Sequence, residues 1–319
     1  MMPYEKHYAA LIQSAGIARL DDRIVVRVIG DDRVTFMHGM CSQDIQNLQP
    51  GMTAPALLLT EHAHVVADFF IYATDDAALL IEIERSLWPC ARAHLEKFLV
   101  ADDVEFEELE GLTVVDIEGP AAAETIAAIG TEGIKVAKEW RHFIAGPARI
   151  ASIPRFGGPA FTLLADTSAV PDLIATMLQS PSHSELVEPS ALELLRIENR
   201  IALVGVDTTD KTLALEARLE RAISFNKGCY IGQETVERAT ARGGVKKRLC
   251  SLKIEGNEVP LANSAVFLDG KEIGCLTSVL QSPRLGVIGL GILHHSAWRP
   301  GTPVLIGAAE YAFRAVVQS

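Results

Sequence analysis

The sequence predicts an α+β protein with two mixed lobes and a smaller all-β domain at its C-terminal end. Its 319 residues favour two or three domains, and a hydrophobic share of 49% can fill more than one core. Strand-like and helix-like segments are mixed, with hairpins as well as crossovers, as far as residue 244. We therefore expect α+β lobes at residues 1–110 and 111–244, and a small antiparallel barrel or sandwich at 245–319.

The first lobe is expected to contain four strands and two helices. One apolar run ends at the Gly30-Asp31 turn, and apolar segments on either side of residues 61–64 suggest a hairpin. Apolar residues at i, i+3 and i+4 spacing then predict an amphipathic helix. The expected strands lie at 24–29, 53–59, 65–73 and 78–83, and the expected helices at 33–40 and 85–99.

The second lobe is expected to mix strands and helices in the same way. Gly119-Pro120 opens an alanine-rich helix, and Leu192, Leu195 and Ile197 mark the apolar stripe of the most strongly patterned one. The expected strands lie at 113–117, 141–144, 150–153 and 160–164, and the expected helices at 120–129, 170–178, 188–199 and 233–241.

The C-terminal domain has a different pattern. Beyond Gly244, Gly, Asn, Asp and Pro residues separate short apolar segments, which is typical of antiparallel strands joined by tight turns. The expected strands lie at 248–254, 265–268, 272–279, 286–293 and 303–306.

The overall charge argues against a nucleic-acid partner. The formal net charge is −12, whereas binding to nucleic acid without sequence preference needs clustered cations. Basic residues gather once along the chain, and this cluster favours a small anionic ligand over a polymer. Its members are Arg238, Arg242, Lys246, Lys247 and Arg248.

The five cysteines are scattered, which indicates reduced thiols in a cytoplasmic protein and not a disulfide framework. Their spacing does not suit a self-contained iron–sulfur site, which usually needs four thiolates. His62 and His64 lack an evident third ligand, so no metal is expected. We also expect no leader peptide, because residues 1–20 contain no apolar run behind a basic start. We expect no membrane contact, because no run of 18 uninterrupted apolar residues occurs. The oligomeric state is left open.

Residues 227–234, with the sequence KGCYIGQE, form the most informative segment. Lys227 lies two residues before Cys229, and a nearby cation lowers the pKa of a thiol. Gly228 and Gly232 free the backbone for a close approach or a positive φ. The segment from Gln233 is helix-forming, so its first N–H groups would favour an anion near the thiol. The alternative is that Cys229 is a small buried residue in a tight turn.

This octet resembles the K-G-C-[YF]-x-G-Q-E signature of YgfZ-type folate-binding proteins, relatives of the glycine-cleavage T-protein that serve iron–sulfur cluster assembly and repair. Further groups of residues are similar to the family pattern, in the same order, over most of the chain. They are Gly30-Asp31, Phe36-Met37, Gln43-Asp44, the segment 65–70, Arg196 with Glu198, Gly205 with Asp207, Glu216-Ala217, the segment 274–278, and Ser282-Pro283.

The resemblance implies a three-part cloverleaf, in which two α+β lobes and a C-terminal antiparallel β-barrel surround a central folate-binding hole. The implied cofactor is tetrahydrofolate or a one-carbon-substituted folate. Glu198 matches the family position that binds the pterin edge, where an amino group and a ring N–H lie side by side and one carboxylate accepts both hydrogen bonds. A solvated carboxylate on a helix face is the alternative for Glu198.

Three more residues are candidates for the ligand site. Asp68 matches the T-protein carboxylate beside the folate nitrogen that carries the one-carbon unit, and in an apolar strand it is costly unless it is paired or faces a ligand. Arg238 or Arg242 is a candidate to hold the anionic glutamate tail. The alternatives are a strand-end Asp68 that points into water, and surface arginines that aid solubility.

The chain departs from the family pattern at several positions. Asn199-Arg200 stands where the family usually has Ala-Gly, and a bulky cation there would narrow or close the pterin pocket. Ala63 lies in a turn that often carries Gly, and Ala214 replaces a proline. These departures bear on folate binding more than on the fold.

The favoured function is a tetrahydrofolate-binding accessory protein for the assembly or repair of iron–sulfur enzymes, with Cys229 as its functional thiol. Its partners would be the folate and iron–sulfur client or assembly proteins. The alternative is a tetrahydrofolate-dependent aminomethyltransferase or methyltransferase that uses Asp68 electrostatically. A third reading, motivated by Arg200, is a descendant that has lost its ligand. Whether the protein is an enzyme is left open.

Overall fold

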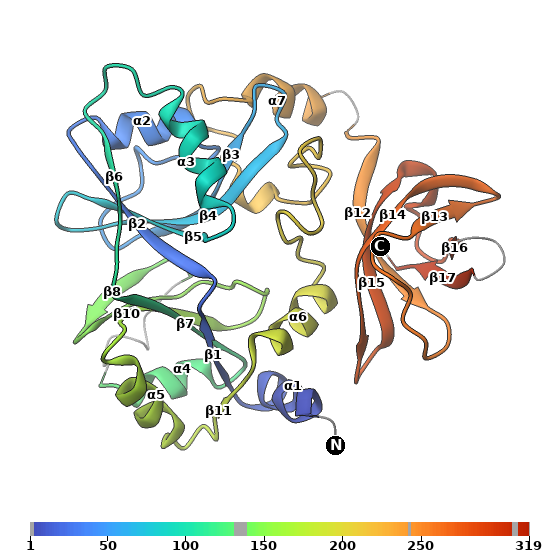
Figure 1. Ribbon diagram of the computed structural model, residues 1–319, viewed down its shortest axis with the longest axis horizontal. Coiled ribbons are helices and arrows are strands. Elements are labelled where there is room, and N and C mark those ends of the chain that lie inside the picture. The colour runs from blue at the N-terminus through green and yellow to red at the C-terminus, as the bar shows by residue number, and fades with distance from the viewer. Residues whose placement is uncertain (1–2, 131–138, 242–243, 308–311, 319) are drawn as a thin grey trace. The chain divides into compact units, whose positions relative to one another are not determined.

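The computed structural model describes residues 3–130, 139–241, 244–307 and 312–318 (Figure 1). Two sheet lobes and a closed six-stranded antiparallel barrel make up the fold, which confirms the predicted α+β class. The chain divides into two compact units, of which the first holds most of both sheets and the second holds the barrel. The first unit is Met1–Leu58, Val66–Leu192 and Ala222–Tyr230, and the second is Leu59–Val65, Glu193–Arg221 and Ile231–Ser319.

The sheet of the first lobe has five strands in the order β3-β4-β5-β2-β6. The predicted hairpin is confirmed at both strands, because the apolar segments are long and the turn between them is polar. The elements are β2 Arg23–Ile29, α2 Arg33–Met40, β3 Thr53–Leu59, β4 Val65–Ala73, β5 Leu79–Glu84, α3 Trp88–Glu96 and β6 Glu105–Glu108. Helix α3 is shorter than predicted and begins beside Pro89, whose missing N–H is tolerated in a first turn.

The sheet of the second lobe has six strands in the order β11-β1-β7-β10-β9-β8. The elements are α1 Pro3–Gln13, β1 Gly16–Leu20, β7 Leu112–Glu118, α4 Ala122–Ala127, β8 His142–Ala145, β9 Ala148–Ala151, β10 Ala160–Asp166, α5 Val170–Leu178, β11 Glu185–Leu186 and α6 Pro189–Glu198. Strand β1, which the sequence did not predict, pairs antiparallel with β7 along its whole length. The N-terminal strand therefore completes the second sheet and not the first.

The second lobe has its own apolar core. Ile17 of β1 and Ile117 of β7 lie opposite each other in the strand register, and both are fully buried. Val170 and Met177 of α5 join the same core, so the helix packs its apolar stripe against the sheet. Helix α5 has the bounds that the sequence predicted, 170–178.

The C-terminal domain is a closed antiparallel barrel in the order β12-β15-β14-β13-β16-β17 (Figure 1). Its elements are β12 Lys247–Ile254, β13 Ala265–Leu268, β14 Lys271–Ser282, β15 Gly286–His294, η3 His295–Ala297, β16 Pro303–Ile306 and β17 Phe313–Val317. Strand β17, which was not predicted, pairs with β12 and closes the barrel. Gly274 is required in β14, because a Cβ there would lie 2.0 Å from the carbonyl oxygen of Ile292.

A buried ion cluster joins the two lobes within the first unit. The Glu82 carboxylate of β5 accepts hydrogen bonds from Arg155 Nη2 at 2.7 Å, from the Tyr72 hydroxyl at 2.7 Å, and from Arg23 Nε. Arg155 belongs to the turn between β9 and β10, and its Nε also lies 3.3 Å from Asp116 of β7. Burial would raise the pKa of Glu82, but the attraction of Arg155 and Arg23 outweighs it and lowers that pKa to about 2.

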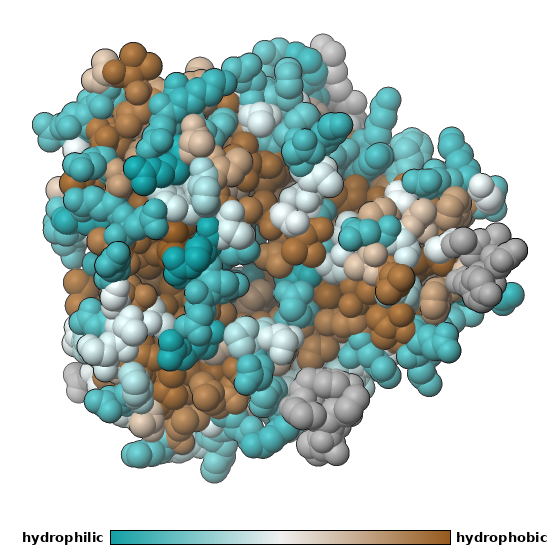
Figure 2. Space-filling model, viewed as in Figure 1, coloured by the Kyte–Doolittle hydropathy of each residue, from teal (hydrophilic) through white to brown (hydrophobic). Residues whose placement is uncertain are grey.

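The surface is mixed in character. On the face drawn in Figure 2, hydrophilic residues are interspersed with apolar ones. In the described part of the chain, no helix is long and apolar enough to cross a membrane.

The five cysteines are free thiols, and the described residues contain no group of three or more His, Cys, Asp or Glu side chains that would hold a metal ion.

Replacement of Glu82 should destabilise the fold in a pH-dependent way. We expect Glu82→Gln to lower the free energy of unfolding at pH 7 by about 3 kcal/mol, because it leaves buried guanidinium groups without their carboxylate. The folded-state pKa lies below the ordinary value of 4.5, so this contribution is present above pH 4.5 and is lost as the pH falls toward 2. Denaturant unfolding at several pH values measures it.

The difference between wild type and Glu82→Gln should therefore narrow as the solution is acidified. Glu84→Gln is the matched control, since Glu84 ends the same strand and is only partly buried. An unfolding difference that stays constant from pH 7 to pH 3 would contradict the assigned role of Glu82.

Candidate functional site

The thiol turn lies between η2 Glu220–Ala222 and α7 Gln233–Ala241, so the predicted 233–241 helix is confirmed. Cys229 is exposed, which excludes the reading of a small buried residue in a tight turn. Gly232 has a φ of +90°, and a Cβ there would lie 2.7 Å from the carbonyl oxygen of Thr60. A side chain at this position would be both strained and obstructed, so the glycine is required by the backbone.

Lys227 fixes the thiol turn to the end of α2. Its ammonium donates hydrogen bonds to the carbonyl oxygens of Cys41 and Gln43, both at 2.8 Å, and to that of His38. The Nζ atom also lies 5.0 Å from the centre of the Tyr230 ring. An ammonium has three N–H donors, and three carbonyls use them. The geometry thus makes Lys227 a clamp between residues far apart in the sequence.

The charge of Lys227 acts on a second thiol that the sequence did not single out. Burial raises the pKa of the Cys41 thiol, and the nearby Lys227 ammonium opposes that rise only in part. The pKa of Lys227 itself is lowered, mainly by burial. Activation of Cys229 by Lys227 stays a prediction.

His38 lies beneath the thiol turn and was missed by the sequence analysis. It is 8% exposed, its Nδ1 lies 3.4 Å from Asp44 Oδ1, and a Cβ at Gly228 would lie 3.6 Å from its Nε2. Burial and the charge of Lys227 lower the pKa of His38, while Asp44 raises it. A neutral imidazole is therefore favoured here at pH 7. A single histidine in an otherwise mixed helix gave no pattern that would have identified it.

Glu198 is the last residue of α6, and its side chain is 1% exposed. Its Oε2 accepts a hydrogen bond from Arg284 Nη2 at 2.6 Å, and its Oε1 accepts one from the Ser282 hydroxyl. Ser282 Oγ also accepts from the backbone N–H groups of Arg284 at 3.1 Å and Leu285 at 3.0 Å. The expected alternative of a solvated carboxylate on a helix face is therefore excluded, because this carboxylate is buried and paired.

A cavity of about 440 Å³ opens beside Glu198, within the second unit. Its walls come from the end of α6, from strands β12 and β15, from the turn between β14 and β15, and from the C-terminal segment. The lining residues are Ile197, Glu198, Arg200, Ser251, Leu252, Lys253, Arg284, Leu285, Ile288 and Gln318.

Arg200 ends helix α6 in a left-handed conformation, with a φ of +61°. The N–H of Ile201 bonds to the carbonyl of Arg196 at 2.9 Å, and the N–H of Arg200 bonds to that of Ile197 at 3.2 Å. This pair of bonds is a Schellman motif, whose left-handed position is usually a glycine. The glycine that the family has here is thus explained by the backbone, and Arg200 occupies a conformation that is unfavourable for it.

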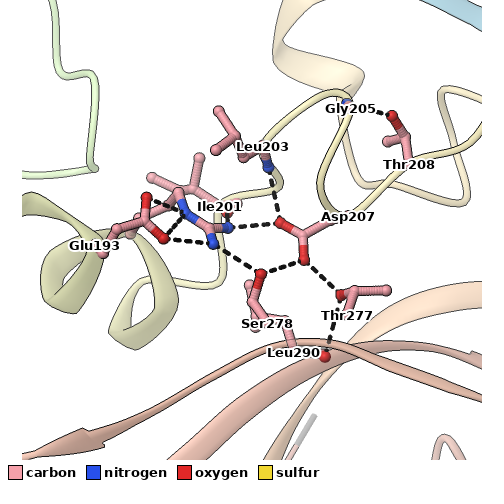
Figure 3. Close-up of polar contacts among 10 residues, drawn as sticks. Glu193, Ile201, Leu203, Gly205, Asp207, Thr208, Thr277, Ser278 and Leu290 are labelled. Atoms are coloured by element: carbon pink, nitrogen blue, oxygen red, sulfur yellow. Dashed lines mark hydrogen bonds and ion pairs between the residues drawn. The ribbon is translucent and has the colours of Figure 1, made fainter. Parts of the chain in front are cut away.

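A buried ion pair organises the same region (Figure 3). Arg196 Nη1 lies 2.6 Å from Asp207 Oδ2, and the two side chains are 2% and 0% exposed. Asp207 also accepts a hydrogen bond from Ser278 Oγ at 2.7 Å and one from the Thr277 hydroxyl, and Arg196 Nη2 donates to Ser278 Oγ at 2.8 Å. The motif residues around 196, 207 and 277–278 therefore form one network that ties α6 to β14.

The remaining predicted site residues belong to other elements or lie outside the described residues. Asp68 is half-buried in β4 between the buried Ala67 and Phe69. Arg238 pairs with Glu234 on the exposed face of α7, and such a surface pair contributes little stability. Arg242 lies outside the described residues. The roles of Asp68, Arg238 and Arg242 toward a ligand stay predictions.

Two sheet lobes followed by a closed barrel, with a polar network between α6 and the barrel, define a T-protein-like architecture. The chain matches the GCVT N-terminal domain over residues 3–227 and the glycine cleavage T-protein C-terminal barrel domain over residues 247–319. It belongs to the glycine cleavage T-protein family.

Known relatives agree with this assignment. A crystal structure of glycine cleavage system aminomethyltransferase T from Bartonella henselae has the same fold, with a TM-score of 0.89 at 22% identity over 99% of this chain and 88% of that one. An aminomethyltransferase of Rippkaea orientalis is 25% identical over 90% of this chain and 80% of its own length. A chloroplastic protein of Arabidopsis thaliana, provisionally named a transferase, is 26% identical, and the chain spans 66% of that relative.

Replacement of Arg200 by glycine should stabilise the protein. We expect Arg200→Gly to raise the free energy of unfolding by about 0.5–1 kcal/mol, because relief of the left-handed strain exceeds the extra entropy of glycine in the unfolded chain. Denaturant unfolding measures the change. Arg200→Ala is the matched control, since it removes the same side chain and keeps the strained Cβ. An equal gain from alanine would refute the conformational explanation.

Proposed function

We propose that this chain is a YgfZ-type, tetrahydrofolate-binding accessory protein for the assembly or repair of iron–sulfur enzymes, with Cys229 as its functional thiol. The observation that carries the proposal is an exposed cysteine on a turn held in place by the half-buried Lys227 and its ammonium. A thiol that reacts with a partner or ligand must be accessible, whereas a structural cysteine is usually buried.

The environment of the turn supports a positioned thiol. Lys227 binds three carbonyls of residues 38–43, so the backbone that carries Cys229 is tied to α2. The buried His38 places its imidazole next to Gly228 of the same turn. A mobile surface cysteine would need neither contact. Free thiols at all five cysteine positions suit the proposed cytoplasmic location.

Folate binding is supported by family membership and by the polar groups around Glu198. Members of this family that are aminomethyltransferases use tetrahydrofolate, and the sequence similarity covers both domains of the fold. We propose that Glu198 and Asp68 belong to the folate site, with Arg238 and Arg242 near the anionic tail. The bonds from Ser282 and Arg284 hold the Glu198 carboxylate in a fixed orientation.

A tetrahydrofolate-dependent aminomethyltransferase or methyltransferase is the second candidate. The names of the relatives favour it, since those of Rippkaea orientalis and Nostoc are aminomethyltransferases at 25% identity. Such an enzyme would use Asp68 beside the one-carbon unit and would not need Cys229. Product formation from a methylamine-bearing donor and tetrahydrofolate separates the two candidates, because an accessory protein gives no turnover.

Loss of the Cys229 thiol should abolish the accessory function and leave the fold intact. We expect Cys229→Ala to fail to restore iron–sulfur enzyme activity in a strain that lacks this protein, while its thermal unfolding matches wild type. Cys90→Ala is the matched control, because Cys90 is also exposed but belongs to α3 and not to the thiol turn. Full restoration by Cys229→Ala would remove the thiol from the mechanism.

Tetrahydrofolate should bind to the purified protein. Calorimetric titration is expected to give one site per chain, and Glu198→Gln should weaken binding about tenfold, because a neutral amide accepts weaker hydrogen bonds than a carboxylate. The absence of heat at millimolar tetrahydrofolate would refute folate binding and support a descendant that has lost its ligand.

A further inference from the structure

Two buried carboxyl groups lie on one face of the central strand of the second lobe. Asp116 and Glu118 are two residues apart on β7, so their side chains project from the same side of the sheet. They are 0% and 1% exposed. Glu118 lies opposite Gly16 of β1 and Ala160 of β10, neither of which has a polar side chain. The cross-strand neighbours of Glu118 therefore offer its carboxyl group no side-chain donor.

One oxygen of each carboxyl group lacks a hydrogen bond. Asp116 Oδ1 accepts a hydrogen bond from Thr162 Oγ1 at 2.7 Å, and Asp116 Oδ2 lies 3.3 Å from Arg155 Nε. Glu118 accepts a hydrogen bond from the backbone N–H of Phe156. Among the described residues, Asp116 Oδ2 and Glu118 Oε1 have no hydrogen-bond donor. Buried polar atoms normally have a partner, so these two oxygens require a donor.

The charges of the buried ion cluster also do not balance. Its charged and titratable groups are Arg23 of β2, Tyr72 of β4, Glu82 of β5, Asp116 and Glu118 of β7, and Arg155 of the turn between β9 and β10. Three carboxyl groups thus face two guanidinium groups. With all of them ionised, one negative charge would be buried without compensation, and a carboxyl group in that position takes up a proton instead.

The surroundings of each carboxyl group show where the proton belongs. Burial, followed by the charge of Asp116, raises the pKa of Glu118 well above its ordinary value. Burial also raises the pKa of Asp116, although the attraction of Arg155 opposes that rise. Glu82 bonds to both guanidinium groups, and its pKa is about 2. Asp116 and Glu118 interact directly, so they titrate as a pair and not as two separate acids.

We propose that Asp116 and Glu118 form a proton-binding site, which holds one proton between Glu118 Oε1 and Asp116 Oδ2 at neutral pH and thereby stabilises the cluster that joins the two lobes. The proton supplies the missing donor and removes the uncompensated charge. Thr162 and Arg155 hold Asp116 as the carboxylate, so Glu118 is the carboxylic acid of the pair. The site is independent of the function proposed above.

Infrared spectroscopy of the full chain tests for the proton directly. At pH 7 the wild-type protein should show the C=O absorption of a protonated carboxyl group, and Glu118→Gln should lose it. Glu124→Gln is the matched control, because Glu124 is exposed on α4, and it should keep the absorption. A wild-type spectrum without a protonated carboxyl group at pH 7 would overturn the proposal, whether or not the variant folds.

Thermal unfolding tests the contribution to stability. Because the folded-state pKa of Glu118 is raised, its contribution is fully present below pH 4.5 and is lost as the pH rises through that raised pKa. The amide of Glu118→Gln is neutral at every pH and can still donate to Asp116. Its thermal midpoint should equal that of wild type at pH 7 and exceed it by about 2–4 °C in alkaline solution, where wild type loses the proton.

Glu82→Gln gives the contrasting result in the same cluster, since it removes an ionised carboxylate and should lower the midpoint at pH 7. A Glu118→Gln protein that is less stable than wild type at pH 7, or that does not fold, would overturn the proposal, because an amide reproduces the shape and neutrality of the protonated acid. A midpoint difference that stays constant as the solution is made alkaline would also overturn it.

Discussion

The buried ion pair between Arg196 and Asp207 is the constraint on which the second unit depends. Both charges are removed from water, so each is tolerated only because the other is present and because hydroxyls and backbone groups use their remaining bonds. The pair joins the last turns of α6 to strand β14 through Ser278. Glu198 ends α6 and Ser282 ends β14, so the position of the buried carboxylate and its hydroxyl partner follows from this pair.

Much of the fold was predictable because long segments carry a clear hydrophobic pattern. The hairpin of β3 and β4, helix α5 and strands β13 and β16 have the predicted bounds. Strands β1 and β6 were missed, since GIARL is short and EFEE is mostly charged. Their strand conformation depends on pairing with β7 and β2, which are distant in sequence, and not on local preference.

The candidate site was predictable only in part. The octet 227–234 drew attention to Cys229, whose thiol is exposed. The partners of Lys227, however, are backbone carbonyls about 190 residues away, and no side-chain pattern encodes them. Lys253 and Arg284 gave no signal, because they meet Glu198 and Arg200 only when the barrel folds. Arg200 was expected to narrow or close a pocket. That expectation stays a prediction; the structure shows that Arg200 lines the cavity beside Glu198 and has a left-handed backbone at the helix end.

The place of β1 affects how the protein is made. Residues 16–20 leave the ribosome well before their partner in β7, which begins at residue 112. At roughly 5–20 residues per second, the nascent N-terminal strand waits on the order of 5–20 s before its hydrogen-bonding edge is covered. During vectorial synthesis an apolar segment thus stays unpaired while the strands of the first sheet are being made. Chaperones that hold nascent chains would act on this interval, and a shortened N-terminus would leave β7 uncovered on one side in the mature fold.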